Sequence, residues 1–190
     1  MTRLALFLLV GGAAAFFNVD MLKSRVRVGQ KAPEWEVEIH TGQLLSTEFL
    51  AGQPYVLWFY PTAGESLAIT EALSFSALFD DFKRMGYPRV FGVSTDSVEV
   101  NKAFHDKYEL PFALCCDYDK VLTKAFDGCK PSKDATDFCA MAIPACVVVD
   151  GDGMIMSYEY PFDPRLGPRN LLNSLTPRVG PTSLKAPKSN

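Results

Sequence analysis

A continuous apolar run at residues 55–60, ended by Pro61, constrains the fold of this chain more than any other feature. A strand that is apolar on both faces has to be covered on both sides, as in the centre of an α/β sheet. A second buried strand is predicted at residues 89–94, after a long segment with apolar residues at helical spacing. The chain is therefore expected to build helical layers around a central sheet.

The segments around these two strands continue the alternation. Helices are expected over 66–85, over 98–108 with Asp96 or Ser97 as cap, and over 120–126 and 170–175; further strands are expected over 35–39, 112–116, 145–149 and 154–158. A polar loop spans 127–142, and residues 150–153 are typical of a hairpin turn. This order predicts an α/β sandwich with a mixed central sheet flanked by helices. Right-handed crossovers make the first units parallel, and the hairpin adds the antiparallel part.

Composition excludes some classes of function. The chain has 22 acidic and 19 basic side chains and a net charge of −3, so it lacks the basic field that nucleic-acid binding requires. The two histidines, His40 and His105, are far apart in the sequence, which argues against a histidine-rich metal site. No metal and no cofactor are expected.

The N-terminal segment is typical of a targeting signal. Arg3 precedes an apolar stretch at 4–17, which is shorter than the ~20 residues that span a membrane comfortably. We therefore expect a signal peptide at 1–15, cleaved after Ala15, and no stable membrane span in the mature chain. An uncleaved anchor is the alternative.

The next segment, 16–28, starts with Phe16 and is mostly basic in its charges. Small residues, then Phe, then a basic stretch resemble the bipartite plastid signal of diatoms and related algae. This resemblance implies a plastid of secondary origin as the destination, with 16–28 as a transit or leader segment. The alternative is the secretory pathway, with the protein in the endoplasmic reticulum lumen or secreted. The proline-rich tail, 177–190, is expected to be disordered.

All five cysteines lie after residue 114, and their number is odd. There is no C-x-x-C motif, so neither a zinc ribbon nor a dithiol motif is predicted. Cys129 and Cys139 flank a loop that contains Gly and Pro, and we expect them to form a disulfide. Cys115 and Cys116 are expected at the carboxyl end of a parallel strand, either as small apolar side chains or as redox thiols.

Five short segments in this order resemble the peroxiredoxins of the alkyl hydroperoxide reductase/thiol-specific antioxidant group, above all the peroxiredoxin Q or bacterioferritin comigratory protein branch. They are VGQKAP at 28–33, WFYP at 58–61, VSTDS at 93–97, YELPF at 108–112 and VVDGDG at 148–153. The resemblance implies a thioredoxin-like domain over residues 29–176. It also implies thiol-dependent reduction of hydroperoxides, with thioredoxin as a partner.

The family's catalytic residues are missing from the matching positions. Pro61 matches, but Glu65 stands at the family's Thr and Ala68 at its peroxidatic Cys. The branch's resolving Cys falls on Leu73, and the supporting Arg falls on or near Pro144. Cleavage of a peroxide O–O bond needs a thiolate nucleophile, which Ala68 cannot provide.

The sequence therefore predicts a degenerate peroxiredoxin with a binding or structural role, whose partner is thioredoxin or another protein. The alternative is a thiol–disulfide oxidoreductase, or an atypical thioredoxin-dependent peroxidase, that uses Cys115, Cys116, Cys129 and Cys139. The bond before Pro144 is either cis, like the proline beside thioredoxin redox sites, or trans at the start of a strand.

Overall fold

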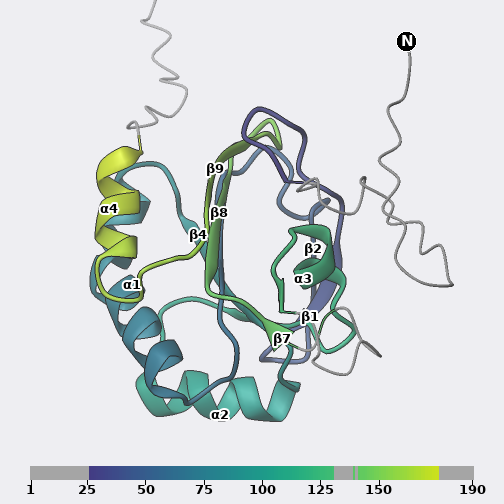
Figure 1. Ribbon diagram of the computed structural model, residues 1–190, viewed down its shortest axis with the longest axis vertical. Helices are drawn as coiled ribbons and strands as arrows, with labels where there is room; N and C mark the ends of the chain where they lie inside the picture. Colours follow the sequence, from purple (N-terminus) through teal and green to yellow (C-terminus); the bar gives the residue numbers. More distant parts are fainter. Residues whose placement is uncertain (1–25, 131–138, 140, 176–190) are drawn as a thin grey trace, which may run out of the picture.

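The computed structural model describes residues 26–130, 139 and 141–175. They form a mixed seven-stranded sheet with helices on both sides (Figure 1). In spatial order, its strands are β2 (Leu44–Ser46), β1 (Glu36–Ile39), β5 (Leu114–Cys116), β4 (Arg89–Ser94), β3 (Tyr55–Phe59), β8 (Ala145–Val149) and β9 (Ile155–Glu159). The pairs β3–β4 and β4–β5 are parallel, and the others are antiparallel. The expected thioredoxin-like α/β architecture is confirmed.

Helices α1 (Ser66–Arg84), α2 (Val98–Tyr108) and α4 (Gly167–Ser174) pack on one face of the sheet, and the short α3 (Val121–Ala125) lies on the other. Figure 1 shows α1 and α4 side by side on the left of the sheet, with α2 below them. The expected bounds of α1 and α2 are confirmed within a residue. Gly86, with φ +89°, adopts the left-handed backbone conformation just after α1.

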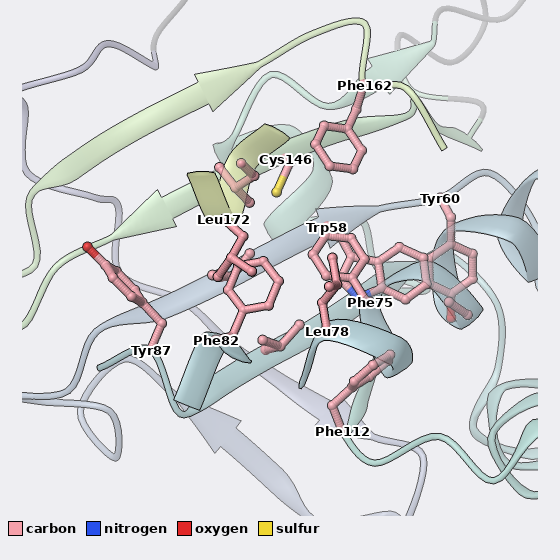
Figure 2. Close-up of a cluster of buried hydrophobic side chains, with 14 of the residues drawn as sticks. Trp58, Tyr60, Phe75, Leu78, Phe82, Tyr87, Phe112, Cys146, Phe162 and Leu172 are labelled. Atoms are coloured by element: carbon pink, nitrogen blue, oxygen red, sulfur yellow. The ribbon is translucent and has the colours of Figure 1, made fainter. Parts of the chain in front are cut away.

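The sheet separates two apolar layers. Under α1, α2 and α4, Trp58 stacks on Phe75 with ring centroids 5.4 Å apart (Figure 2). An ideal Cβ at Gly92 would lie 2.7 Å from the Trp58 indole, so this neighbouring strand position needs glycine. The other layer contains Trp35, which meets Tyr55 edge-on at 6.0 Å. The central strand β3 contributes side chains to both layers, as its apolar run predicted.

Some features of the fold differ from the expected pattern. The three-residue strand β2 was missed, and the polar loop contains a two-stranded ribbon, β6 (Cys129–Lys130) and β7 (Met141–Ala142). Helix α4 begins at Gly167 rather than at Asn170. Val26 is buried in the second layer, and its backbone N–H donates to Asp127 Oδ2 at 3.1 Å. A leader that ended at residue 28 would therefore include a core residue.

Within residues 26–130 and 141–175, no helix is long and apolar enough to cross a membrane. The expected signal peptide and tail lie outside the described residues, as does most of the expected leader.

Candidate functional site

Two positions at which the resemblance predicts site residues meet at one edge of the sheet. The backbone N–H of Tyr60 donates to the Val93 carbonyl at 3.0 Å, which places the end of β3 beside the end of β4. Phe59 pairs with Ala145 in the antiparallel register of β3 and β8. Pro144, one residue before Ala145, therefore lies beside the start of the turn at Pro61. The structure brings Pro61 and Pro144 together, although they lie 83 positions apart in the sequence.

The turn between β3 and α1 is tied to the segment that follows β4. Ala63 N–H donates to Asp96 Oδ2 at 2.8 Å, and Gly64 has φ +81°. Glu65 is the N-cap of α1, but its side chain makes no capping hydrogen bond and is exposed. Ala68, in the first turn of the helix, is 0 % exposed. The position at which the resemblance predicts the nucleophile is thus a buried methyl group.

The bond between Ile143 and Pro144 is trans, which decides between the two alternatives left by the sequence. Among the described residues, the cis X-Pro bond is Tyr160–Pro161. The Pro144 carbonyl accepts a hydrogen bond from Phe162 N–H at 3.1 Å. Pro144 therefore links the start of β8 to the chain that follows β9, without a cationic side chain.

A buried polar network lies at the same edge, beneath α2. The Tyr60 hydroxyl donates to Asn101 Oδ1 at 2.6 Å, and Asn101 Nδ2 donates to Ser94 Oγ at 3.2 Å and to Cys116 Sγ at 3.4 Å. Tyr60, Ser94 and Asn101 are fully buried. Each of these polar side chains has a partner within the protein, as buried polar groups usually do.

The three free thiols are poor nucleophiles. Cys115, Cys116 and Cys146 are all buried. Burial raises the pKa of each, and for Cys115 and Cys146 it does so well above the usual range. The pKa of Cys116 is lowered in part by the Asn101 hydrogen bond, but the carboxylates of Glu38 and other acids oppose this. Because the thiolate is the reactive form, these residues do not suit redox catalysis at neutral pH.

Cys129 and Cys139 form a disulfide, with their Cα atoms 4.8 Å apart. This confirms the pairing predicted from the sequence. Cys129 belongs to β6 and is partly exposed, whereas Cys139 is fully buried. The ribbon joins the site edge through Ile143, whose N–H donates to the Gly128 carbonyl at 2.9 Å. A redox role for these cysteines stays a prediction.

The two histidines, far apart in the sequence, are in contact. The rings of His40 and His105 stack with centroids 3.9 Å apart. His40 Nδ1 accepts the backbone N–H of Leu114 at 3.2 Å. Burial lowers the pKa of His40 to about 4, and the neighbouring His105 contributes. In the described part of the chain, no three His, Cys, Asp or Glu residues are grouped to hold a metal.

Glu71 is the most unusual residue near the site. It lies one turn after Ala68, on the face of α1 that packs against the sheet, and it is 0 % exposed. Neither of its carboxyl oxygens has a hydrogen-bond partner. Burial, with a smaller contribution from Asp163, raises the pKa of Glu71 to about 8. Cys146 on β8 lies within the electrostatic reach of this carboxyl.

Sequence reasoning missed Asn101 and Glu71, although both leave a signal. Glu71 interrupts the apolar stripe formed by Ala68, Ala72 and Phe75, and Asn101 lies three residues before the buried Phe104. A polar residue inside an apolar helical stripe predicts either a satisfied internal partner or an unusual protonation state. Asn101 is the first case, and Glu71 is the second.

Comparison with known proteins identifies the type of scaffold. The family model described as "AhpC/TSA family" matches residues 28–158. "Peroxiredoxin Bcp" of Bacillus subtilis is 34 % identical over 109 residues, which cover 57 % of this chain and 69 % of that protein. "Peroxiredoxin Q, chloroplastic" of Populus jackii is 33 % identical over 101 residues, covering 53 % of this chain and 47 % of that protein. The chain thus spans between about half and about two thirds of the length of these curated relatives.

Solved structures agree with this match. Peroxiredoxin Q of Xanthomonas campestris superposes with a TM-score of 0.68 at 25 % identity, covering 74 % of this chain and 89 % of that one. PrxQ of Xylella fastidiosa gives a TM-score of 0.73 at 24 % identity, with coverages of 80 % and 97 %. The second likeness concerns the fold alone.

Proposed function

The chain belongs to the AhpC/TSA family, with a scaffold of the peroxiredoxin Q/Bcp type, and on that basis we propose that it is a degenerate member that has lost peroxidase turnover. The family's activity is peroxide reduction. In this chain, the same scaffold serves a binding or structural role in redox homeostasis, with thioredoxin or another protein as partner.

The observation that carries this proposal is Ala68. Attack on a peroxide O–O bond forms a bond between sulfur and oxygen, so it needs a thiolate. A methyl group that is 0 % exposed supplies neither the nucleophile nor access to it. Pro144, at the position of the supporting Arg, supplies no positive charge to stabilise an anion. Loss of a covalent nucleophile removes most of the catalysed rate.

The other thiols do not compensate. Cys115, Cys116 and Cys146 are buried, and their pKa values are raised. Cys129 and Cys139 are joined to each other. Neither group offers an exposed, acidified thiolate at the edge that carries Ala68.

Peroxide consumption by the purified chain, with thioredoxin, thioredoxin reductase and NADPH, tests the proposal. We expect no turnover above a protein-free control. Ala68→Cys should gain only weak activity, because the carboxylate of Glu65 opposes formation of a nearby thiolate. Ala68→Cys with Glu65→Thr should be faster than Ala68→Cys alone. Turnover by the unaltered chain at rates typical of the family would overturn the proposal.

A second candidate function is thiol–disulfide exchange at Cys129–Cys139. It is favoured by the disulfide itself and by the partial exposure of Cys129, where a reductant's thiolate can attack. Attack on Cys129 would form a mixed disulfide and release the Cys139 thiolate; a second thiol of the reductant would then displace Cys129. Reduced thioredoxin should reduce one disulfide per chain, and one thioredoxin should be oxidised for each. The double variant Cys129→Ser, Cys139→Ser should oxidise no thioredoxin. Cys146→Ser, the matched control, should oxidise as much as the unaltered chain. An unreacted disulfide after prolonged incubation would exclude this function.

We also propose that the chain is delivered to a plastid of secondary origin. The support is the N-terminal sequence, together with the chloroplastic names of plant relatives such as the Populus protein. A fluorescent fusion of residues 1–30 should reach the plastid, and Phe16→Ala should misroute it. If the fusion stays in the secretory pathway, or if the substitution changes nothing, the plastid assignment fails.

A further inference from the structure

The carboxyl of Glu71 lies between α1 and the sheet, where it has no partner. Its neighbours along α1, Ala68 and Ala72, are both 0 % exposed, so this face of the helix rests fully on the sheet. Both oxygens of Glu71 are buried without a hydrogen bond. An ionised carboxylate in such a place is far more costly than a neutral acid, because nothing replaces its lost hydration.

The groups that Glu71 meets on the packed elements do not favour its ionisation. Cys146 on β8 interacts with it, and Glu159 on β9 pairs with Cys146 in the antiparallel register. Asp163, between β9 and α4, adds a negative charge that raises the pKa of Glu71 further. On the strand next to β8, Cys146 pairs with Trp58, which does not titrate and whose buried Nε1 donor also lacks a hydrogen-bond partner. Among the described residues, none of the groups that shift this pKa is a cation.

We propose that Glu71 is a proton-sensitive latch: its protonated carboxyl keeps the first turns of α1 packed on the sheet, and its ionisation favours a state in which these turns are released. The released turns carry Ala68, so the latch controls access to the site edge. The carboxyl can ionise freely only where water reaches it, and release of this part of α1 would expose it to water. The device is independent of the loss of peroxidase activity, since it depends on Glu71 and not on position 68.

The location of Glu71 limits what the latch moves. It lies in the second turn of a helix whose later turns are held by Phe75, Leu78 and Phe82, all buried in the same layer (Figure 2). The turn before the helix is anchored by the Ala63–Asp96 hydrogen bond. Release should therefore affect the start of α1 more than its end.

Native-state hydrogen exchange across a pH series tests the latch. After correction for intrinsic exchange, the opening constant of amides at 70–74 should rise by up to about tenfold per pH unit between about pH 5 and about pH 8. Amides at 78–84 of the same helix should rise much less. In Glu71→Gln the pH dependence at 70–74 should vanish. Glu65→Gln, the same change at an exposed carboxyl on this helix, should behave like the unaltered chain.

Two further measurements keep the proposal open to refutation if Glu71→Gln folds poorly. The side-chain carboxyl carbon of Glu71, followed by NMR in the unaltered chain, should titrate near pH 8. Glu71→Leu, which fills the site with an apolar side chain, should also remove the pH dependence. A flat profile in the unaltered chain, an equal rise at both ends of α1, or an unchanged profile in both Glu71 variants would overturn the latch.

Discussion

Helices α1 and α2 cover the same face of the sheet, and each places one polar side chain in the interior. Asn101 on α2 and Glu71 on α1 are both 0 % exposed. Asn101 bonds to Tyr60, Ser94 and Cys116, whereas neither oxygen of Glu71 has a partner. A buried polar group that is fully paired fixes a helix in place, and one that is unpaired makes the helix depend on protonation.

The two helices should therefore respond to pH in opposite directions. Glu71 has a raised pKa, so the stability that its protonated form allows falls as the pH rises from about 4.5 to about 8. His40, which stacks on His105 of α2, has a lowered pKa, so stability falls as the pH drops from about 6.5 to about 4. Between about pH 4.5 and about pH 6.5 the two effects partly cancel.

The largest expected change in stability comes from replacing Asn101. Asn101→Leu leaves the Tyr60 hydroxyl and Ser94 without their amide partner in a site that water does not reach. We expect the free energy of unfolding to fall by about 3–4 kcal/mol, measured by urea denaturation. Asn101→Asp, which keeps an acceptor for Tyr60 but buries an acid, is an informative companion. A loss below about 1 kcal/mol for the Leu variant would contradict the contrast between the helices.

Glu71→Leu should change stability in the opposite direction. At pH 8 the variant should be more stable by about 2–3 kcal/mol, because it removes a buried acid whose ionisation favours the unfolded chain. Near pH 4.5 most of the gain should disappear, because the carboxyl is then protonated in the folded state and about half protonated in the unfolded chain. Denaturation at the two pH values measures the difference. A pH-independent gain would mean that only packing had changed.

A smaller loss of stability is expected from His40, which follows β1 and stacks on His105 of α2. The unaltered chain should lose about 1–2 kcal/mol, relative to His40→Gln, between about pH 6.5 and about pH 4.5. Gln retains an acceptor for the Leu114 N–H but does not titrate. The comparison of the two proteins at each pH cancels the contribution of their carboxylates. Parallel profiles for the two proteins would exclude His40 as the cause.

The smallest effect concerns the helix starts. Ser97 caps α2 by accepting the Val100 N–H at 3.4 Å, whereas the Glu65 side chain makes no such bond at α1. Ser97→Ala should cost about 1 kcal/mol, and Glu65→Ala should stay within about 0.5 kcal/mol of the unaltered chain. Thermal unfolding of the two variants measures the difference in stability between them. Equal losses at both positions would remove this distinction.

Periodicity predicted the elements that decide the fold. The apolar run at 55–60 gives the central strand, and the spacing of Phe75, Leu78 and Phe82 gives α1, because these patterns extend over several residues. Strand β2 has only three residues and an exposed Leu44, so alternation could not reveal it. The start of α4 was also missed, because Pro168 is tolerated in the first turn of a helix.

The site was predictable in part. The resemblance named Pro61, Ala68 and Pro144 as site positions, and the β3–β8 register brings Pro61 and Pro144 together. The spacing of Cys129 and Cys139 predicted their disulfide. Contacts between distant segments were not predictable. The stacking of His40 and His105 depends on how β1 and α2 pack, and sequence separation says nothing about this. The unpaired state of Glu71 likewise depends on the elements packed against it, which provide no hydrogen-bond donor to its carboxyl.

The distribution of the two tryptophans makes each layer separately observable. Trp58 lies under α1 against Phe75, and Trp35 lies on the other side of the sheet against Tyr55. Indole emission depends on the polarity around the ring, so a Trp35→Phe protein would report optically on the α1 layer alone. Trp58→Phe would report on the other layer. The chain thus contains one intrinsic fluorophore for each side of its sheet, and no external dye is needed to tell which side loosens first.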